Sequence, residues 1–159
     1  KTVAVIGGGN SALDATLQMA NIAKHVYLIN INPVLGGDPV MREKAVNNSR
    51  VTVLNSAITK AVKGDNFVTG LVVEHEGVVK DIELQGVFVE IGSISNSGLI
   101  DFVVKNKGGE IVVDSFNRTS VPGIFAAGDV TDVPEKQIII AAGEGAKALL
   151  AAFRYLMES

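Results

Sequence analysis

The sequence predicts an α/β fold whose first unit is a strand, a glycine-rich turn, a helix and a second strand. A β-branched apolar run covers Thr2–Ile6, and apolar residues then recur near helical spacing from Leu13. Strand-like composition returns at His25–Ile29. This alternation is typical of a parallel sheet built with helices. A chain of 159 residues can form one ordinary domain or two partial ones, with a real core.

The turn after the first strand has the spacing of a dinucleotide-binding fingerprint, with Gly7, Gly9 and Ala12 at its three positions. Gly7 permits the tight turn, Gly9 lets a pyrophosphate approach the backbone, and Ala12 keeps the helix close to the sheet. Free N–H groups at the helix N-terminus favour phosphate, and Asn10 and Ser11 add side-chain donors. The stretch predicts a Rossmann-like nucleotide-binding domain. The alternative is a glycine turn made only for packing.

Asn30 ends the second strand about 20 residues after Gly9, where such domains contact the nucleotide ribose. Asn32–Asp38 reads as a loop, and Asp38 is a good N-cap for a helix that starts at Pro39 and ends at about Asn47 or Asn48.

An antiparallel β-meander is predicted after a strand at Arg50–Leu54. Its segments are separated by the hairpin signals Gly64-Asp65-Asn66 and Glu76-Gly77 and cover Ile58–Val62, Phe67–Glu74 and Val78–Leu84. His75 is expected to be an exposed residue and His25 a surface or helix C-terminal residue, neither with a catalytic role.

Gly86–Ile91 resembles a buried strand. Its end at Ile91 and Gly92 is a candidate neighbour of the nucleotide, because ligands of open α/β sheets collect at the carboxyl ends of strands. The alternative is an ordinary glycine at a strand end.

The composition excludes several functions. A net charge of −3 gives no basic field for nucleic acid, and no apolar run is long enough to be a transmembrane helix. The chain has no cysteine, which excludes thiol catalysis and thiolate metal sites within it, and its two histidines offer little to a metal. We expect a cytoplasmic protein that binds neither nucleic acid nor membranes.

A second informative stretch is VPGIFAAGDV at Val121–Val130. It predicts a strand at Ile124–Ala127 that ends in Gly128 and Asp129, where a carboxylate suits hydrogen bonds from sugar hydroxyls. Gln137–Leu156 predicts a long helix, buried over much of its circumference because it is so apolar. The chain has no second glycine fingerprint, so we expect the other half of this site to lie upstream of Lys1.

Together GGGNSA, FVEIG, VPGIFAAGD and KQIIIAAGEGAKALLAAFRYL resemble the low-molecular-weight thioredoxin reductases, and more closely the flavoprotein component of the alkyl hydroperoxide reductases. The resemblance implies an enzyme in which a reduced nicotinamide passes hydride to FAD, which reduces a Cys-x-x-Cys disulfide serving a thioredoxin- or peroxiredoxin-type protein. It implies a homodimer as the full-length protein. It also implies that residues 1–92 form an NAD(H)-binding domain and residues 93–159 the C-terminal part of an FAD-binding domain. Without the N-terminal half, the fragment is expected to be inactive.

The resemblance assigns roles by position. Those matched to the nicotinamide nucleotide are Gly7, Gly9, Asn10, Ser11, Ala12, Asp14, Ile91 and Gly92. Those matched to FAD are Gly128 and Asp129, which meet the ribityl chain, and Lys136, Gln137 and Ile138, which meet the flavin. Asp14 stands for a family glutamate and is one methylene shorter, and Lys136 resembles the peroxide-reductase branch. Ser95-Asn96 replaces the Pro-Asn that the family often has.

The residues at the ribose position favour NADH over NADPH. NADPH-dependent members carry basic residues there, whereas this chain has Asn30-Ile31-Asn32, which gives a 2′-phosphate no counter-charge. The amide oxygen of Asn30 can accept a hydrogen bond from a 2′-hydroxyl, although we expect weaker binding than a glutamate gives.

Two other functions stay open. One is a non-catalytic NADH-binding module, and the other is a cysteine-free flavoprotein that reduces a ferredoxin- or flavodoxin-type protein.

Overall fold

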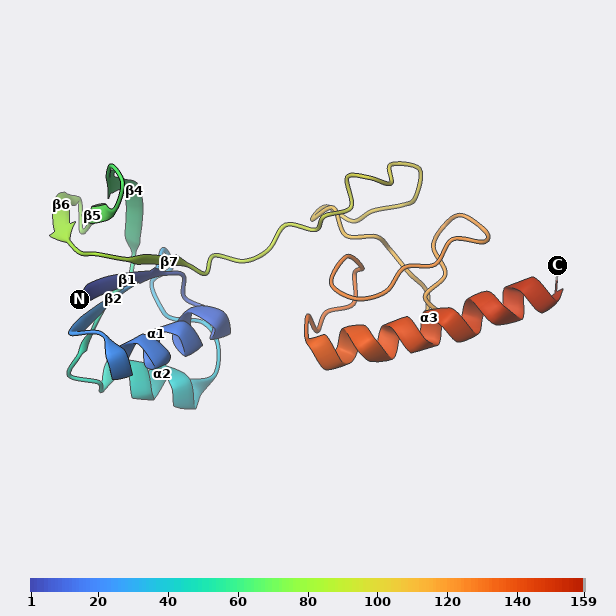
Figure 1. Ribbon diagram of the computed structural model, residues 1–159, viewed down its shortest axis with the longest axis horizontal. Helices are drawn as coiled ribbons and strands as arrows, with labels where there is room; N and C mark the ends of the chain where they lie inside the picture. The colour runs from blue at the N-terminus through green and yellow to red at the C-terminus, as the bar shows by residue number, and fades with distance from the viewer. Residues whose placement is uncertain (159) are drawn as a thin grey trace. The chain divides into compact units, whose positions relative to one another are not determined.

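The computed structural model describes residues 1–158, which divide into two compact units (Figure 1). Unit 1 is Lys1–Gly92, and unit 2 begins at Ser93.

A parallel sheet forms the centre of unit 1, with the strand order β3-β2-β1-β7. Its strands are β1 (Thr2–Ile6), β2 (His25–Ile29), β3 (Val51–Leu54) and β7 (Val87–Val89). The register pairs Thr2 with His25 and Ile6 with Ile29. Strand β7 is shorter than the predicted Gly86–Ile91, so Ile91 and Gly92 lie in the segment beyond it.

Helices cover one face of the sheet. Helix α1 (Asn10–Ile22) buries Ala12, Leu13, Thr16 and Ala20, which recur at helical spacing. Helix α2 (Pro39–Val46) begins as predicted, because Asp38 Oδ1 accepts hydrogen bonds from the backbone N–H groups of Val40 (2.8 Å) and Met41 (3.2 Å). The core under these helices includes Val3, Val5, Val26 and Leu28.

The predicted meander is confirmed as an antiparallel sheet of β4 (Ala57–Gly64), β5 (Val68–His75) and β6 (Val78–Glu83). Its buried residues pack with Ala4 and Ile29 of the parallel sheet, which alternate along their strands with the helix-facing residues. The parallel sheet therefore lies between the helices and the meander (Figure 1). His75 at the end of β5 is half-buried, with its Nδ1 atom inaccessible, so its predicted exposure is wrong.

Unit 2 consists of loops followed by the helix α3 (Ile138–Glu158). The strand predicted at Ile124–Ala127 is wrong, because only Phe125 forms a bridge, to Arg118. A strand needs a neighbour that pairs its N–H and C=O groups along its length, and Ala126 instead bonds to Asn117.

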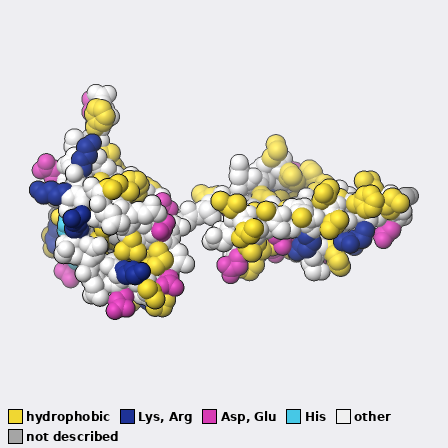
Figure 2. Space-filling view, turned by 60° about the horizontal axis from the view of Figure 1, so that its bottom comes forward, with side chains coloured by type: hydrophobic (Ala, Val, Ile, Leu, Met, Phe, Trp, Pro, Cys, Tyr) yellow, Lys and Arg dark blue, Asp and Glu magenta, His cyan; other side chains and the backbone are white. Residues whose placement is uncertain are grey.

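The predicted burial of the last helix is wrong within the described residues. Ala151 is the buried residue of α3, whereas Ile138 is 92% exposed and Leu156 is 73% exposed. Apolar side chains accordingly gather on the surface of unit 2 (Figure 2). Within residues 1–158 we find no helix with both the length and the apolar character needed to cross a membrane.

Candidate functional site

The sheet order of unit 1 creates the point at which open α/β sheets bind ligands. Strand β1 pairs with β2 on one side and with β7 on the other, so the strand order reverses at β1: β2 and β3 follow on one side, and β7, which comes after the meander, lies on the other. A cavity of about 590 Å³ lies at the carboxyl ends of these strands. Predicted residues that line it are Gly7, Gly9, Asn10 and Ser11 after β1, Asn30 after β2, and Ile91 and Gly92 after β7.

The turn between β1 and α1 has the shape that a phosphate group needs. Gly7 has a φ of +145°, and a Cβ atom there would lie 2.1 Å from the Glu90 carbonyl oxygen. Ala12 is buried beside Gly7. In contrast, a Cβ atom on Gly9 would meet no atom within 4 Å, so the backbone there is open to a ligand.

The N-terminus of α1 is free to bind an anion. Gly9 is its N-cap and supplies no side-chain hydrogen bond, and the first turn contains no acidic residue. The first N–H groups of a helix have no partner inside it and carry a partial positive charge. A pyrophosphate therefore fits the turn, both sterically and electrostatically.

Asn10 connects this turn to the loop before α2. Its Oδ1 atom accepts a hydrogen bond of 2.7 Å from the backbone N–H of Asp38. The amide oxygen is thus committed to the protein, which leaves the Nδ2 group as the part of this side chain suited to a phosphate oxygen. Ser11 is exposed at the next position.

Asn30 is 1% exposed and makes several hydrogen bonds. Its Nδ2 group donates to the Asn32 carbonyl oxygen (3.0 Å) and to Asn55 Oδ1 (2.8 Å), while its Oδ1 atom accepts from the Asn32 N–H (3.2 Å). A Cβ atom on Gly8 would lie 2.3 Å from Asn30 Oδ1, so this oxygen lies against the phosphate-loop backbone.

Several residues of the cavity were not predicted from the sequence. They include Glu90, next to the predicted Ile91, and Ile58 and Thr59 on β4. The position of Glu90 at a strand end could have indicated it. The contribution of β4 could not be read from the sequence, because it depends on how the meander packs on the sheet.

Asp14 lies outside the main cavity. It lines a shallow hollow beside α1 together with Asn10 and Ser11, and its carboxylate accepts a hydrogen bond of 2.7 Å from Gln18.

The residues matched to FAD lie in unit 2, around the start of α3. Gly128 has a φ of +78°, and a Cβ atom there would lie 3.3 Å from the Ala141 Cβ atom of α3. The Gly128 carbonyl oxygen accepts hydrogen bonds from the Thr131 N–H (3.0 Å) and hydroxyl (2.8 Å). These contacts hold the turn against the first turn of the helix, and Asp129, Gln137 and Ile138 are exposed there.

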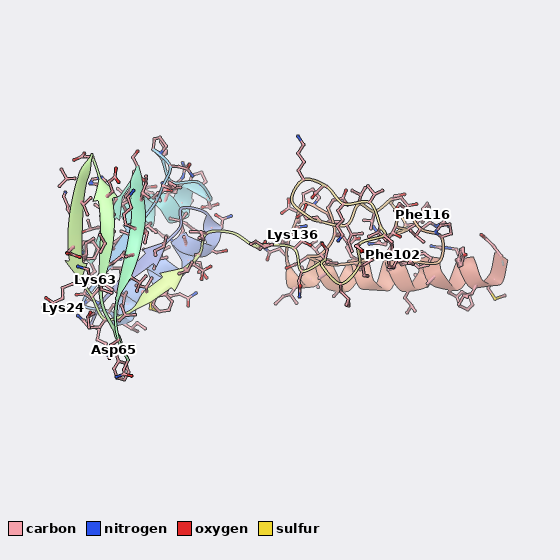
Figure 3. The ribbon with its side chains drawn as sticks, turned by 90° about the horizontal axis from the view of Figure 1, so that it is seen from above. Lys24, Lys63, Asp65, Phe102, Phe116 and Lys136 are labelled. Atoms are coloured by element: carbon pink, nitrogen blue, oxygen red, sulfur yellow. The ribbon has the colours of Figure 1, made fainter. Side chains whose placement is uncertain are left out.

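Lys136 lies near the start of α3 (Figure 3) and has protein partners there. Its ammonium group pairs with Glu110 at 2.9 Å and donates a hydrogen bond to the Thr131 carbonyl oxygen. The hydrogen bond from Lys136, followed by one from Asn106, lowers the pKa of Glu110. Lys136 therefore joins the Glu110 and Thr131 segments next to α3.

Comparison with known proteins identifies the class. Residues 1–145 match the family described as pyridine nucleotide-disulphide oxidoreductase, and the chain belongs to that family. It is 48% identical over 163 aligned positions to an alkyl hydroperoxide reductase component of Pseudomonas aeruginosa, covering 100% of this chain and 31% of that protein. It is 46% identical over 162 positions to an NADH dehydrogenase of Bacillus subtilis, covering 100% of this chain and 32% of that protein.

A solved thioredoxin reductase of Lactococcus lactis is similar in structure. Its TM-score is 0.90 at 26% sequence identity, and the match covers 99% of this chain and 54% of that one. The α/β fold class and the family resemblance predicted from the sequence are therefore confirmed. The chain spans about a third of the length of the curated relatives it matches.

Proposed function

We propose that this chain provides the NADH-binding region and one side of the FAD-binding region of a flavoprotein disulfide reductase. The observation that carries the proposal is the cavity at the sheet's switch point, where the open backbone of Gly9 adjoins an uncapped helix N-terminus. Family membership supports the same assignment.

The nicotinamide nucleotide occupies the unit 1 cavity in this proposal. The first turn of α1 and the Asn10 amide bind the pyrophosphate, Asn30 Oδ1 accepts from a ribose hydroxyl, and Ile91 and Gly92 border the nicotinamide. In this proposal Asp14, which lies outside this cavity beside α1, remains a residue toward the nicotinamide end. NADH is preferred over NADPH, because no Lys or Arg lies at Asn30-Ile31-Asn32 to balance a 2′-phosphate.

Unit 2 contributes to the FAD site. Asp129 accepts hydrogen bonds from the ribityl chain, and Lys136, Gln137 and Ile138 lie along the flavin, with Lys136 also fixing the loops through Glu110 and Thr131. FAD, when bound, supplies two-electron transfer between nicotinamide and disulfide. The FAD fingerprint and the redox cysteines come from outside these 159 residues.

The proposal includes an electron acceptor of the peroxiredoxin or thioredoxin type, a homodimeric full-length protein and a cytoplasmic location. Relatives named as an alkyl hydroperoxide reductase component and as a thioredoxin reductase support the acceptor class.

Titration of the chain with NADH, followed by nucleotide fluorescence, tests the site. Gly9→Val should fold normally, since no atom lies within 4 Å of the added Cβ, and should lose NADH affinity because the side chain fills the phosphate position. Gly98→Val is the matched control, because a Cβ atom there also meets no atom within 4 Å and Gly98 lies outside the cavity. Unchanged NADH affinity in Gly9→Val would refute the site, and tighter binding of NADPH by the wild-type chain would refute the NADH preference.

A further inference from the structure

We infer that Asn55 is a specificity-determining positioning residue, which causes the nucleotide cavity to present a hydrogen-bond acceptor, and no donor, at Asn30. The inference rests on the proposed NADH site. Asn55 itself lies outside that cavity, in the turn between β3 and β4.

The Asn30 amide uses both of its donors within the protein. A primary amide has two N–H donors and one carbonyl oxygen. One N–H of Asn30 goes to the Asn32 carbonyl oxygen and the other to Asn55 Oδ1, at 3.0 and 2.8 Å. Asn30 Oδ1 accepts only the longer bond of 3.2 Å from Asn32 N–H, and so retains acceptor capacity on the side of the phosphate loop.

NADH and NADPH differ at the ribose 2′ position, which is the part of the nucleotide that meets Asn30 in the proposed site. A ribose 2′-hydroxyl can donate to a carbonyl oxygen, whereas a 2′-phosphate carries only acceptor oxygens and negative charge at neutral pH. An amide with its oxygen beside Gly8 at the cavity wall, and with both donors used within the protein, therefore favours the hydroxyl and repels the phosphate.

Asn55 is the side chain that completes this orientation. Without its oxygen, one N–H of a residue that is 1% exposed would lose its partner, which is unfavourable. The Asn30 amide would then be held only by its two bonds to the Asn32 main chain, at 3.0 and 3.2 Å. With one bond fewer to break, the amide turns more easily toward the cavity to donate to a ligand, and a 2′-phosphate is the strongest acceptor that can occupy this position.

The main chain around Asn55 does not depend on its side chain. Asn30 N–H donates to the Leu54 carbonyl oxygen and Ala57 N–H donates to the Asn30 carbonyl oxygen, both at 2.9 Å. Ser56 N–H donates to the Asn32 carbonyl oxygen at 3.0 Å. These bonds fix the turn against the end of β2, so Asn55→Ala removes the acceptor and leaves the turn in place.

The test measures dissociation constants of NADH and NADPH for three variants of the full chain. Asn55→Ala should lower the ratio of the NADPH constant to the NADH constant by about tenfold, the effect of one hydrogen bond to a charged group. Asn55→Asp keeps an acceptor for Asn30, so the ratio should stay the same or rise. Asn48→Ala is the matched control, because it deletes one side-chain bond, from Arg50 N–H at 2.9 Å, at the opposite end of β3, and should leave the ratio unchanged.

The outcomes separate the two proposals. If the wild-type chain binds neither nucleotide, the proposed function fails and this inference fails with it. If the wild-type chain prefers NADH and Asn55→Ala keeps the same ratio, or Asn55→Asp lowers it, the inference alone is overturned. Should Asn55→Ala not fold, Asn55→Ser, whose short hydroxyl cannot span the contact with Asn30, replaces it with the same expected decrease.

Discussion

The two units of the chain use apolar residues in opposite ways. Unit 1 has apolar cores on both faces of the parallel sheet, and its largest fully buried apolar side chains are Leu13, Leu28, Ile29, Leu71 and Leu84. In unit 2, α3 leaves most of its large apolar side chains on the surface, including Ile138, Leu149, Phe153 and Leu156. Unit 1 therefore has the core that supports a binding cavity, whereas α3 takes its helical form mainly from its alanine-rich local sequence.

The two units also differ in how their backbone polar groups are hydrogen-bonded. In unit 1, many backbone N–H and C=O groups are paired between neighbouring strands of the parallel and antiparallel sheets. Unit 2 uses side chains to hold its loops, since Asp114, Asn117 and Thr131 all bond to backbone groups. Regular ladders are stable to most single substitutions, so unit 2 should be the region more sensitive to the loss of one polar side chain.

The largest expected effect contrasts two leucines. Leu28→Ala should destabilise the chain by about 2–5 kcal/mol, because it leaves a cavity in a closed core. Leu149→Ala, at a side chain 70% exposed, should change stability by less than about 0.5 kcal/mol. Urea unfolding measures both, and an equal loss for the two variants would contradict the difference between the units.

Asn117 provides the next test. It has a φ of +61° and is buried, and its Nδ2 group donates to the Ala126 carbonyl oxygen (2.9 Å) and to Glu144 (2.5 Å). Asn117→Ala should cost about 2–3 kcal/mol, from the lost bonds and from the left-handed backbone. Asn117→Gly loses the same bonds without the backbone strain, so it should cost about 1 kcal/mol less. Hydrogen exchange at the Ala126 amide reports the effect locally, and equal exchange in both variants would show that the strain contributes nothing.

The sequence predicted unit 1 well because its signals are local. The spacing of Gly7, Gly9 and Ala12, the cap at Asp38 and the alternating meander strands each indicate one element on their own. The predictions that were wrong, a strand at Ile124–Ala127 and burial of the last helix, needed neighbouring segments that the described part of the chain does not provide. Cavity residues on β4, such as Thr59, depend on tertiary packing, and the hydrogen bonds of Asn30 to Asn32 and Asn55 depend on the turn that follows β3.

Acid should weaken unit 2 through carboxylates whose pKa is lowered. The hydrogen bond from Lys147, followed by that from Asn117, lowers the pKa of Glu144 from its ordinary value of 4.5. A lowered pKa in the folded state contributes stability above pH 4.5, and this contribution is lost as the pH falls through the folded pKa. Hydrogen exchange of α3 amides should therefore accelerate as the pH falls below 4.5, beyond its intrinsic pH dependence.

Glu144→Gln should reduce that acid sensitivity, because the amide keeps an acceptor for Asn117 but has no charge to titrate. Glu158→Gln makes the same change at an exposed position on the same helix and should leave the acid sensitivity as it is. An unchanged pH profile in Glu144→Gln would assign the effect to other groups, of which Glu110 and Asp114 also have lowered pKa values.

The smallest changes in stability should come from the loss of ion pairs. They compare a pair between the strands of unit 1 with a pair between the loops of unit 2. Lys63, which Figure 3 labels on the meander, pairs with Asp81 at 2.7 Å, and the two side chains are 51% and 64% exposed. The β4–β5 and β5–β6 ladders hold these strands without the pair, so Lys63→Met should cost less than about 0.5 kcal/mol. Lys136→Met should cost about 1 kcal/mol, because Lys136 is less exposed and joins Glu110 to the Thr131 carbonyl in a region without ladders. Thermal unfolding of both variants at low and high salt measures the two losses of stability. If Lys63→Met costs as much as Lys136→Met, the loops of unit 2 do not depend on their side chains more than the strands of unit 1 do.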